Sequence, residues 1–534
     1  MIWVDREIKK IKELRQSGKR KNQPEWVDDM KTPSGRIHVG ALRGVVIHDL
    51  VYKVLLENGI KSNFTYVFDD HDPMDAIPSY LNYSHWEKYA GQQLYRIPAP
   101  RSGFKNFAEF YAQEFIEVFN SINCRPKIIW SSQLYNQGKM NSVIKEVLDA
   151  APKIREIYYR VSKATKPENW YPFNVVCEKC QKIGTTMVYK WDGKYVYYRC
   201  LPQMVSWAQG CGHQGKVSPF NGTGKIPWKV EWAAKWKVIG VTIEGAGKDH
   251  MSAGGSHDIA KSICEQILRY PTPYPLPYEW FTVGGKKMSS SKGVGSSAKE
   301  VAQILPANVF RFLIVRTPIN TALDFNPYGE TILNLFDDYD RCLNAYFDKQ
   351  AKKIPKGKTG EVILDFARII ELSQVTPLPK KRLFLPRFRT IVNLIKNRMD
   401  VLTFFNDQKK SLLTKEEKEI LEERIIFAKI YLKTYYQEEL SEKTKKIKTF
   451  SLTNKQKQFI NDLTKALLTI KKEDKELIQS TIFSVLKKGK YQAREVFPAF
   501  YQLTIGQPFG PKAADLIIQE GIKEIIKKLD RQKT

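Results

Sequence analysis

The stretch WVDDMKTPSGRIHVGALRGVVIHDLVYKVLLENGIKSNFTYVF, residues 26–68, decides the fold of this 534-residue chain. Residues 26–27 predict a short buried strand, which leads into a turn at 32–35. Apolar residues then recur at three- and four-residue steps over 42–55, as they do in a helix. Residues 63–68 predict a second strand. A strand, a glycine turn, a helix and a strand predict the first βαβ unit of a doubly wound parallel sheet.

The α/β pattern is interrupted over residues 73–230, where we expect an insertion. Within it, residues 171–224 are rich in Cys, Gly, Tyr and Trp and predict a small β module. The pattern returns with a predicted strand at 238–243 and a helix from about 256 to 269. Residues 271–277 are rich in proline and predict a linker.

The C-terminal part is helical in pattern almost throughout. We therefore predict an α/β fold with two domains. A Rossmann-type, doubly wound parallel sheet domain covers residues 1–330, with a zinc-binding module inserted, and an all-α domain covers 331–534. No apolar run reaches eighteen residues, so we expect no transmembrane helix. The charged residues 1–20 lack the apolar stretch of a secretory signal.

The chain is strongly basic, with 86 Lys and Arg against 57 Asp and Glu, a net charge of +29. Residues 341–534 alone contain 41 basic and 23 acidic side chains, a net of +18. A positive field of this size attracts polyanions, so nucleic acid is the leading partner. The alternative is that the charge serves only solubility.

The turn after the first predicted strand is a candidate phosphate site. Backbone N–H groups at a helix N-terminus bind phosphate oxygens, and glycines allow the close approach that this requires. A histidine there can donate to a phosphate as charge develops in a transition state. The candidate phosphate-binding residues are Thr32, Pro33, Ser34, Gly35, His38 and Gly40.

A second candidate phosphate-binding segment lies at residues 284–293. Lysines are point cations suited to phosphates, and hydroxyl and backbone N–H groups add further donors. The alternative interpretation is a flexible basic linker. The candidates here are Lys287, Met288, Ser289, Ser290, Ser291 and Lys292.

Four of the seven cysteines suggest a metal site. Cys177 and Cys180 form a Cys-x-x-Cys knuckle, and Cys200 and Cys211 follow downstream. Thiolates select zinc, and four protein ligands would make the ion structural, with no open position for catalysis. The spacing of the second pair is wide, so His213 remains an alternative to Cys211. A low cysteine density also favours a reducing compartment, and we expect a cytoplasmic protein.

Acidic residues end two of the predicted strands, at the edge where doubly wound sheets bind ligands. Asp69, Asp70 and Asp72 follow the first of these strands, and Asp249 and His250 follow the other. Glu231 lies between Trp228 and Trp232, which suits an ammonium group on an aliphatic stem. For any single carboxylate, helix capping or packing is the alternative.

The two phosphate segments together resemble the HIGH and KMSKS signatures of class I aminoacyl-tRNA synthetases. The chain is most similar to the class I lysyl-tRNA synthetases, through residues 32–40, 244–250, 287–293 and 506–512. Two positions depart from the signatures. Ala41 is the last residue of the HIGH-like segment, and Ser290 stands where KMSKS has lysine.

This resemblance implies that the protein activates lysine with ATP and Mg²⁺ and charges tRNA(Lys). We expect a monomer, although the sequence leaves the oligomeric state open. His38, Lys287 and Lys292 would then stabilise the transition state. Asp249 would contact ATP, and the helical domain would contact the tRNA stem and anticodon. Alternatives are a related synthetase for glutamate and a non-catalytic tRNA-binding paralogue. The implied lysine-binding residues are Thr32, Asp69, Asp70, Asp72, Trp228, Glu231 and His250.

Overall fold

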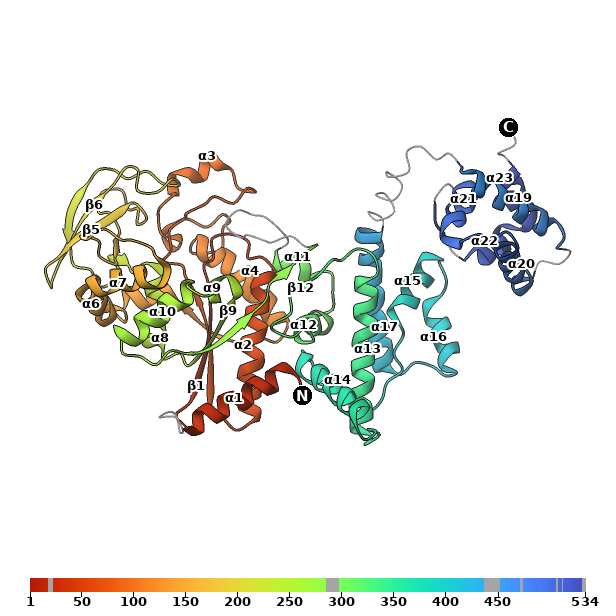
Figure 1. Cartoon of the computed structure of the whole chain (residues 1–534), viewed down its shortest axis with the longest axis horizontal. Coiled ribbons are helices and arrows are strands. Elements are labelled where there is room, and N and C mark those ends of the chain that lie inside the picture. Colours follow the sequence, from red (N-terminus) through yellow and green to blue (C-terminus); the bar gives the residue numbers. More distant parts are fainter. Residues whose placement is uncertain are drawn as a thin grey trace. The chain divides into compact units, whose positions relative to one another are not determined.

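The computed structural model forms two compact units, Met1–Leu432 and Lys433–Thr534 (Figure 1). It describes residues 1–17, 23–284, 297–436, 452–470, 474–505, 508–510 and 512–530. None of the helices in these segments combines the length and apolar character that crossing a membrane requires.

The first unit is built on a five-stranded parallel sheet with the strand order β10-β9-β1-β2-β3. Because the chain extends the sheet from β1 in one direction and then in the other, the order reverses beside β1. Ligands bind at such a point in open α/β sheets, outside the carboxyl ends of the strands. The strands are β1 (Glu25–Lys31), β2 (Ser62–Phe68), β3 (Lys127–Trp130), β9 (Ile243–Gly247) and β10 (Tyr274–Tyr278).

The predicted βαβ unit is confirmed by β1, β2 and the intervening helix α2 (Gly40–Glu57). The apolar side chains from Leu42 to Leu55 that predicted this helix are buried. Helix α2 packs on β1, β2 and β9, so its N-terminus lies at the carboxyl end of β1. The fold places the signature turn, residues 32–40, at the ligand edge of the sheet.

Two local predictions are wrong. The apolar run 238–243 is not one strand, because helix α8 (Trp228–Ile239) continues to Ile239. Gly240, with φ of 89°, ends this helix in the left-handed region, and the strand β9 starts only at Ile243. The predicted linker 271–277 contains strand β10 instead. Its prolines are tolerated because β10 is an edge strand and pairs only with β9.

The insertion predicted at 73–230 is not continuous, because β3 within it belongs to the parallel sheet. After β3, helices and small antiparallel sheets surround a hydrophobic core shared with α8 and α10, whereas α3, η2 and α4 contribute to a second core before β3. Besides β3, the elements of this segment are α3 (Tyr83–Trp86), η1 (Glu87–Tyr89), η2 (Leu94–Arg96), α4 (Phe107–Ser121), α5 (Ser131–Asn136), α6 (Asn141–Asp149), α7 (Ala151–Ser162), β4 (Asn174–Val175), β5 (Thr186–Trp191), β6 (Val196–Cys200), β7 (Gln214–Val217) and β8 (Gly224–Lys225).

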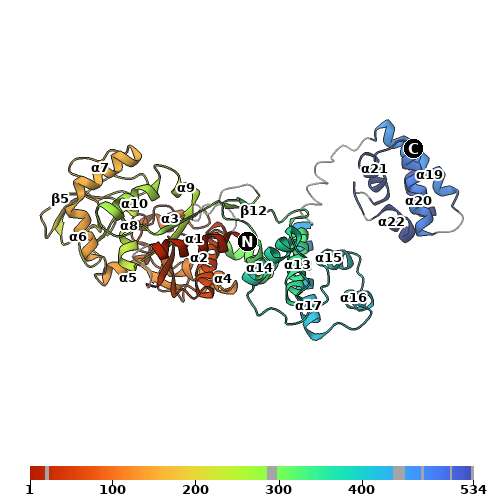
Figure 2. The same cartoon turned by 60° about the horizontal axis from the view of Figure 1, so that its bottom comes forward.

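The helices that follow the parallel sheet in the chain, from α11 to α17, belong to the first compact unit. Helices α13 and α14 lie side by side in two views (Figure 1, Figure 2), and both pack on α12. The boundary predicted at 330/331 therefore falls inside this unit, which extends to Leu432. The remaining elements of this unit are α1 (Trp3–Ser17), α9 (Lys248–Met251), α10 (Ser256–Gln266), β11 (Phe281–Thr282), α11 (Ala298–Ala302), α12 (Ala307–Val315), β12 (Leu323–Asp324), α13 (Thr331–Gln350), α14 (Lys358–Ser373), α15 (Phe388–Lys396), α16 (Val401–Lys409) and α17 (Lys415–Tyr431).

The second unit is all helical in its described residues and has its own hydrophobic core, which includes Phe459, Leu463 and Phe500. A short π-helix, η3 (Leu432–Tyr436), begins at the last residue of the first unit and continues into the second. Its helices are α19 (Asn454–Leu468), α20 (Lys475–Lys488), α21 (Ala493–Ile505), α22 (Ala513–Glu520) and α23 (Ile522–Asp530).

Candidate active site

A cavity of about 800 Å³ lies at the carboxyl ends of the sheet strands, where the reversal in strand order predicts a ligand site. It receives residues from the signature turn, from β1, β2 and β9, from α8, and from the insertion. The predicted site residues that line it are Thr32, Ser34, His38, Gly40, Asp69, Asp72, Trp228, Glu231, Asp249 and His250.

The cavity does not bring in every predicted residue. Pro33, Gly35 and Asp70 are described by the structure and do not line it. The segment with Lys287, Met288, Ser289, Ser290, Ser291 and Lys292 lies outside the described residues.

The signature turn holds His38 against the start of α2. An ideal Cβ on Gly40 would lie 2.8 Å from Nδ1 of His38 and 3.1 Å from the carbonyl oxygen of Phe281. A side chain at position 40 would therefore displace the imidazole or the backbone of β11. Val39 caps α2 without a side-chain hydrogen bond, and the N–H groups of Ala41 and Leu42 donate to the carbonyls of His38 and Val39. The positive end of the helix dipole still faces the cavity and suits an anion.

The start of α11 is attached to this turn. His38 and Ser297 form an antiparallel backbone bridge. The N–H of Ala298 donates to the carbonyl of Ile37 at 2.9 Å. Ser297 caps α11 in a capping box with Glu300, so both sides of this junction are fixed.

Three predicted carboxylates in the cavity are already paired with lysines. Nζ of Lys225 lies 2.7 Å from Oδ1 of Asp72 and also bonds Glu231. Nζ of Lys235 bonds Asp69 and lies 3.2 Å from Oε2 of Glu231. Three carboxylates thus share two buried ammonium groups. Lys225 and Lys235 were missed in the sequence because nothing local distinguishes them from surface lysines.

The pKa shifts follow from this network. Burial alone would raise the pKa of Glu231, but Lys225 and Lys235 outweigh it and lower the pKa. Burial opposes the charge of Lys225, yet Asp72 and Glu231 raise its pKa above the ordinary value. Burial raises the pKa of Asp69 even though Lys235 opposes the shift. The ion pairs satisfy most of the charge of this network within the protein.

Asp70 has a structural position instead. Its carboxylate accepts a hydrogen bond from the backbone N–H of Ser132 at 2.7 Å and another from the Ser132 hydroxyl. These bonds hold the start of α5 beneath β2. Burial raises the pKa of Asp70 to about 6, although the bonds from Ser132 oppose the shift. Its geometry fits the helix-capping alternative.

Two further carboxylates line the cavity and were not among the predicted site residues. Asp29 is on β1 and Glu244 is on β9, with 7 % and 4 % of their surfaces exposed. Among the described residues, neither forms an ion pair with a lysine or arginine. Burial raises the pKa of Asp29, and burial raises that of Glu244 to about 8. The presence of Glu244 in the family-like segment 244–250 was the signal available in the sequence.

Glu244 and Asp29 are held in different ways. The indole N–H groups of Trp232 and Trp236 donate to Glu244, the former at 2.9 Å. Asp29 lies beside the hydroxyl of Tyr278. An ideal Cβ on Gly44 would lie 2.8 Å from Oδ2 of Asp29 and 2.7 Å from that hydroxyl. Gly44 therefore makes room for a carboxylate and a hydroxyl next to each other at the cavity wall, which is a suitable pair of acceptors for an ammonium group.

Aromatic rings surround the acidic groups on the α8 side. The ring of Trp228 lies 6.4 Å from that of Trp232, and His250 meets Trp228 edge-on at 5.7 Å between centroids. Trp228 is 48 % exposed, and Nζ of Lys229 lies 5.6 Å from the centre of its ring. Such a wall suits an aliphatic stem that ends in a cation.

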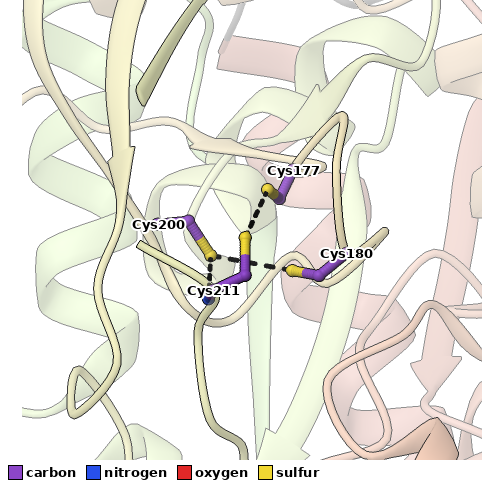
Figure 3. Close-up of side chains that lie close together, drawn as sticks. All are labelled: Cys177, Cys180, Cys200 and Cys211. Atoms are coloured by element: carbon purple, nitrogen blue, oxygen red, sulfur yellow. Dashed lines mark hydrogen bonds between the residues drawn. The ribbon is translucent and has the colours of Figure 1, made fainter. Parts of the chain in front are cut away.

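The four cysteines of the insertion come together (Figure 3). Their sulfur atoms all lie within 4.8 Å of one another. Sγ of Cys177 is 3.6 Å from Sγ of Cys211, and Sγ of Cys180 is 3.7 Å from Sγ of Cys200. Zinc–sulfur bonds of about 2.3 Å in a tetrahedron place sulfurs about 3.8 Å apart, so the spacing fits zinc.

The alternative ligand His213 is not part of this cluster. Its Nε2 faces Oε2 of Glu178 at 4.0 Å. Among the described residues, the group that could hold a metal consists of the four thiols alone. The geometry therefore favours Cys211 as the fourth position.

Comparison with known proteins shows which family the chain resembles. The family model described as tRNA synthetases class I (K) matches residues 1–363. The lysine–tRNA ligase of Picrophilus torridus is 32 % identical over 511 residues, which cover 93 % of this chain and 94 % of that protein. The lysine–tRNA ligase of Methanococcus maripaludis is 32 % identical and covers 97 % of each chain. That of Methanosphaera stadtmanae is 30 % identical, with 93 % and 94 % covered.

Proposed function

This chain belongs to the family of class I (K) tRNA synthetases, and from that premise we propose that it activates lysine with ATP and attaches it to tRNA(Lys). One observation of the structure supports this proposal above the others. A single cavity combines the N-terminus of α2 with two buried carboxylates, Asp29 and Glu244, and in the described part of the chain neither forms an ion pair with a lysine or arginine. The first suits a nucleotide phosphate, and the second suits an amino acid with an ammonium side chain.

The first step is adenylation. The carboxylate of lysine attacks the α-phosphorus of ATP, and pyrophosphate leaves. No general base is required, because the carboxylate is already ionised at neutral pH. The protein therefore contributes by positioning the reactants and by neutralising developing charge. ATP enters with Mg²⁺ on its phosphates, and Mg²⁺ neutralises part of their charge.

The signature turn supplies the chain's own contacts to the phosphates. His38 donates to an oxygen of the α-phosphate, and the N–H groups at the start of α2 bind neighbouring oxygens. Thr32 supports this edge of the cavity through the bond from its hydroxyl to Asp72, 2.6 Å long. From the resemblance to KMSKS, we assign Lys287 and Lys292 to the departing pyrophosphate. In the second step the terminal ribose 2′-hydroxyl of tRNA(Lys) takes the lysyl group.

Lysine selectivity belongs to the acidic wall of the cavity. Asp69, Asp72 and Glu231 each have a lysine partner, so they shape this wall and keep its potential negative. We assign the side-chain ammonium of lysine to Asp29, with the hydroxyl of Tyr278 beside it. Glu244 adds negative charge when ionised, and Trp228 covers the aliphatic stem.

The substrate is identified by ATP–pyrophosphate exchange measured with each of the twenty amino acids in turn. We expect label to enter ATP with lysine and with no other amino acid at comparable concentration. Exchange with glutamate would favour the related synthetase. Exchange with none, together with binding of tRNA(Lys), would identify a non-catalytic paralogue.

We also propose that the basic helices after residue 330 contact the stem and anticodon of tRNA(Lys). The net charge of +18 over residues 341–534 supports an RNA-binding role. We propose a monomer as the active form. We propose a cytoplasmic location as well. The four cysteines of the cluster are free thiols, which is consistent with a reducing compartment.

We propose that Cys177, Cys180, Cys200 and Cys211 hold one structural zinc ion. The ion supplies no chemistry to the reaction, since all four ligands come from the protein. Metal analysis of protein purified without chelator should find about one zinc per chain. Cys211→Ala should lose this zinc, and His213→Ala should retain it.

The opposite pattern would make His213 the fourth ligand. Zinc-free protein in which all seven thiols react with a thiol reagent in the native state would disprove the site. Cys342→Ala is the matched control. This buried cysteine lies outside the cluster, and its loss should leave the zinc content unchanged.

A further inference from the structure

The loop between Cys200 and Cys211 forms part of the cavity wall. Met204, Val205 and Trp207 line the same cavity as the signature turn and the acidic carboxylates. Met204 is 36 % exposed, and Trp207 is partly exposed. The cysteine module therefore extends an apolar, aromatic surface into the active site in addition to holding its own fold together.

The edge of the Trp207 ring abuts a glycine from the other half of the module. An ideal Cβ on Gly184 would lie 2.0 Å from Cη2 and 2.9 Å from Cζ2 and Cζ3 of Trp207, so a larger residue at position 184 would push the ring away. Gly184 follows Cys180 by four residues, and Trp207 precedes Cys211 by four residues. The two contact residues are thus fixed by opposite halves of the cysteine cluster.

Backbone contacts hold the two halves in register. The N–H of Leu201 donates to the carbonyl of Thr185 at 2.8 Å. Nζ of Lys182 donates to the carbonyl of Gln209 at 3.1 Å. These bonds and the cluster leave the Trp207 ring little freedom. An ordered aromatic face at the edge of an open cavity is a preorganised platform for a planar ligand.

The other reactants have sites on other walls. The phosphates of ATP fit the signature turn, and the ammonium of lysine fits Asp29 on β1. The third reactant is the single-stranded 3′ end of an RNA, whose terminal base must lie close to the lysyl-adenylate. Proteins bind single-stranded bases largely by stacking them on aromatic side chains. Lys179 is exposed two residues after Cys177 and adds a positive charge on the same module.

We propose that Trp207, held on Gly184 by the cysteine module, stacks on the 3′-terminal base of the tRNA during lysyl transfer. This inference rests on the proposed function, because it requires a tRNA acceptor. It assigns Trp207 to the second step of the reaction and gives the metal-binding module a role in positioning the RNA end.

The direct test uses tRNA(Lys) that carries 2-aminopurine in place of its terminal adenine. Fluorescence of this base falls when it stacks on an aromatic ring. Binding of the wild-type protein should quench it, and Trp207→Ala should abolish most of the quenching. Gly184→Ala should have the same effect, because the added methyl group displaces the ring. Trp207→Phe should keep part of the quenching.

Kinetics provide the second measurement. In Trp207→Ala and Gly184→Ala, kcat/KM for tRNA in aminoacylation should fall about 10- to 100-fold, the loss expected for one stacked base, while lysine-dependent exchange falls much less. Tyr195→Ala is the matched control, since it removes an aromatic ring of the same module that does not line the cavity. It should preserve both the quenching and the transfer rate.

The metal contribution is tested with Cys211→Ser, which should lose both the bound zinc and the quenching. Trp207→Ala should keep its zinc. Wild-type quenching in Trp207→Ala, or an exchange defect as large as its transfer defect, would overturn the assignment of Trp207. Quenching that survives zinc loss would overturn the role of the module. Failure of the proposed function would show separately, as a wild-type protein without lysine-dependent exchange.

Discussion

Replacing His38 by Ala should slow lysine-dependent ATP–pyrophosphate exchange by about 10²–10³-fold, the effect of removing one transition-state hydrogen-bond donor. The imidazole lies at the N-terminus of α2, where the α-phosphate is expected, and Gly40 leaves space for it. The effect should fall on kcat, because the donor becomes important as charge develops on the phosphate oxygens. The KM for lysine should change little, since the acidic wall is untouched.

The matched control is His85→Ala, which removes an exposed imidazole outside the cavity. It should exchange at the wild-type rate. The melting temperature of both variants should be compared, because His38 also pairs with Ser297 through its backbone. That backbone bridge survives the substitution, so His38→Ala should unfold near the wild-type temperature. A near-normal exchange rate in folded His38→Ala would remove His38 from the mechanism.

Much of the fold could be predicted from residues 26–68, because periodicity and turn chemistry are local properties. The same reasoning failed where an element depends on distant partners. Ile239 belongs to helix α8, whose residues Trp232 and Ala233 are buried in the core. The helix ends only at Gly240, which adopts a left-handed conformation. The proline-rich 271–277 became a strand because β9 is available to pair with it. Strand pairing of this kind is a tertiary effect that a local pattern does not contain.

The sequence could predict the acidic chemistry of the site, but not which lysines form ion pairs with its carboxylates. The sequence indicates that carboxylates gather at the ends of the strands, and Asp69, Asp72 and Glu231 do line the cavity. It does not indicate that Lys225 and Lys235 neutralise them, since Lys235 lies 166 residues from its partner Asp69. Asp29 was missed because its position in the sequence gives no sign that it faces a cavity. A carboxylate inside a strand resembles a solvent-facing residue until the cavity beside it is known.

The same distinction decides which carboxylate binds the lysine side chain. A buried ammonium requires an anion whose charge is not already balanced, because an unpaired buried charge costs several kcal/mol. Glu231 has two lysines within ion-pair distance, so a third cation would gain little from it. Asp29 lines the cavity, and among the described residues its ion-pair contact is a histidine at 3.7 Å.

Asp29→Asn should therefore raise the KM for lysine by roughly 100-fold or more, the scale of breaking a buried ion pair, with the KM for ATP nearly constant. The measurement is pyrophosphate exchange over a range of lysine concentrations.

Ornithine should inhibit the wild-type enzyme, and norleucine, which has a methyl group in place of the ammonium, should not. Asp70→Asn is the matched control, because this carboxylate caps α5 outside the cavity. It should lower thermal stability and leave the KM for lysine unchanged. A wild-type KM in Asp29→Asn, with a large increase in Glu231→Gln, would return the ammonium site to the lysine-paired cluster.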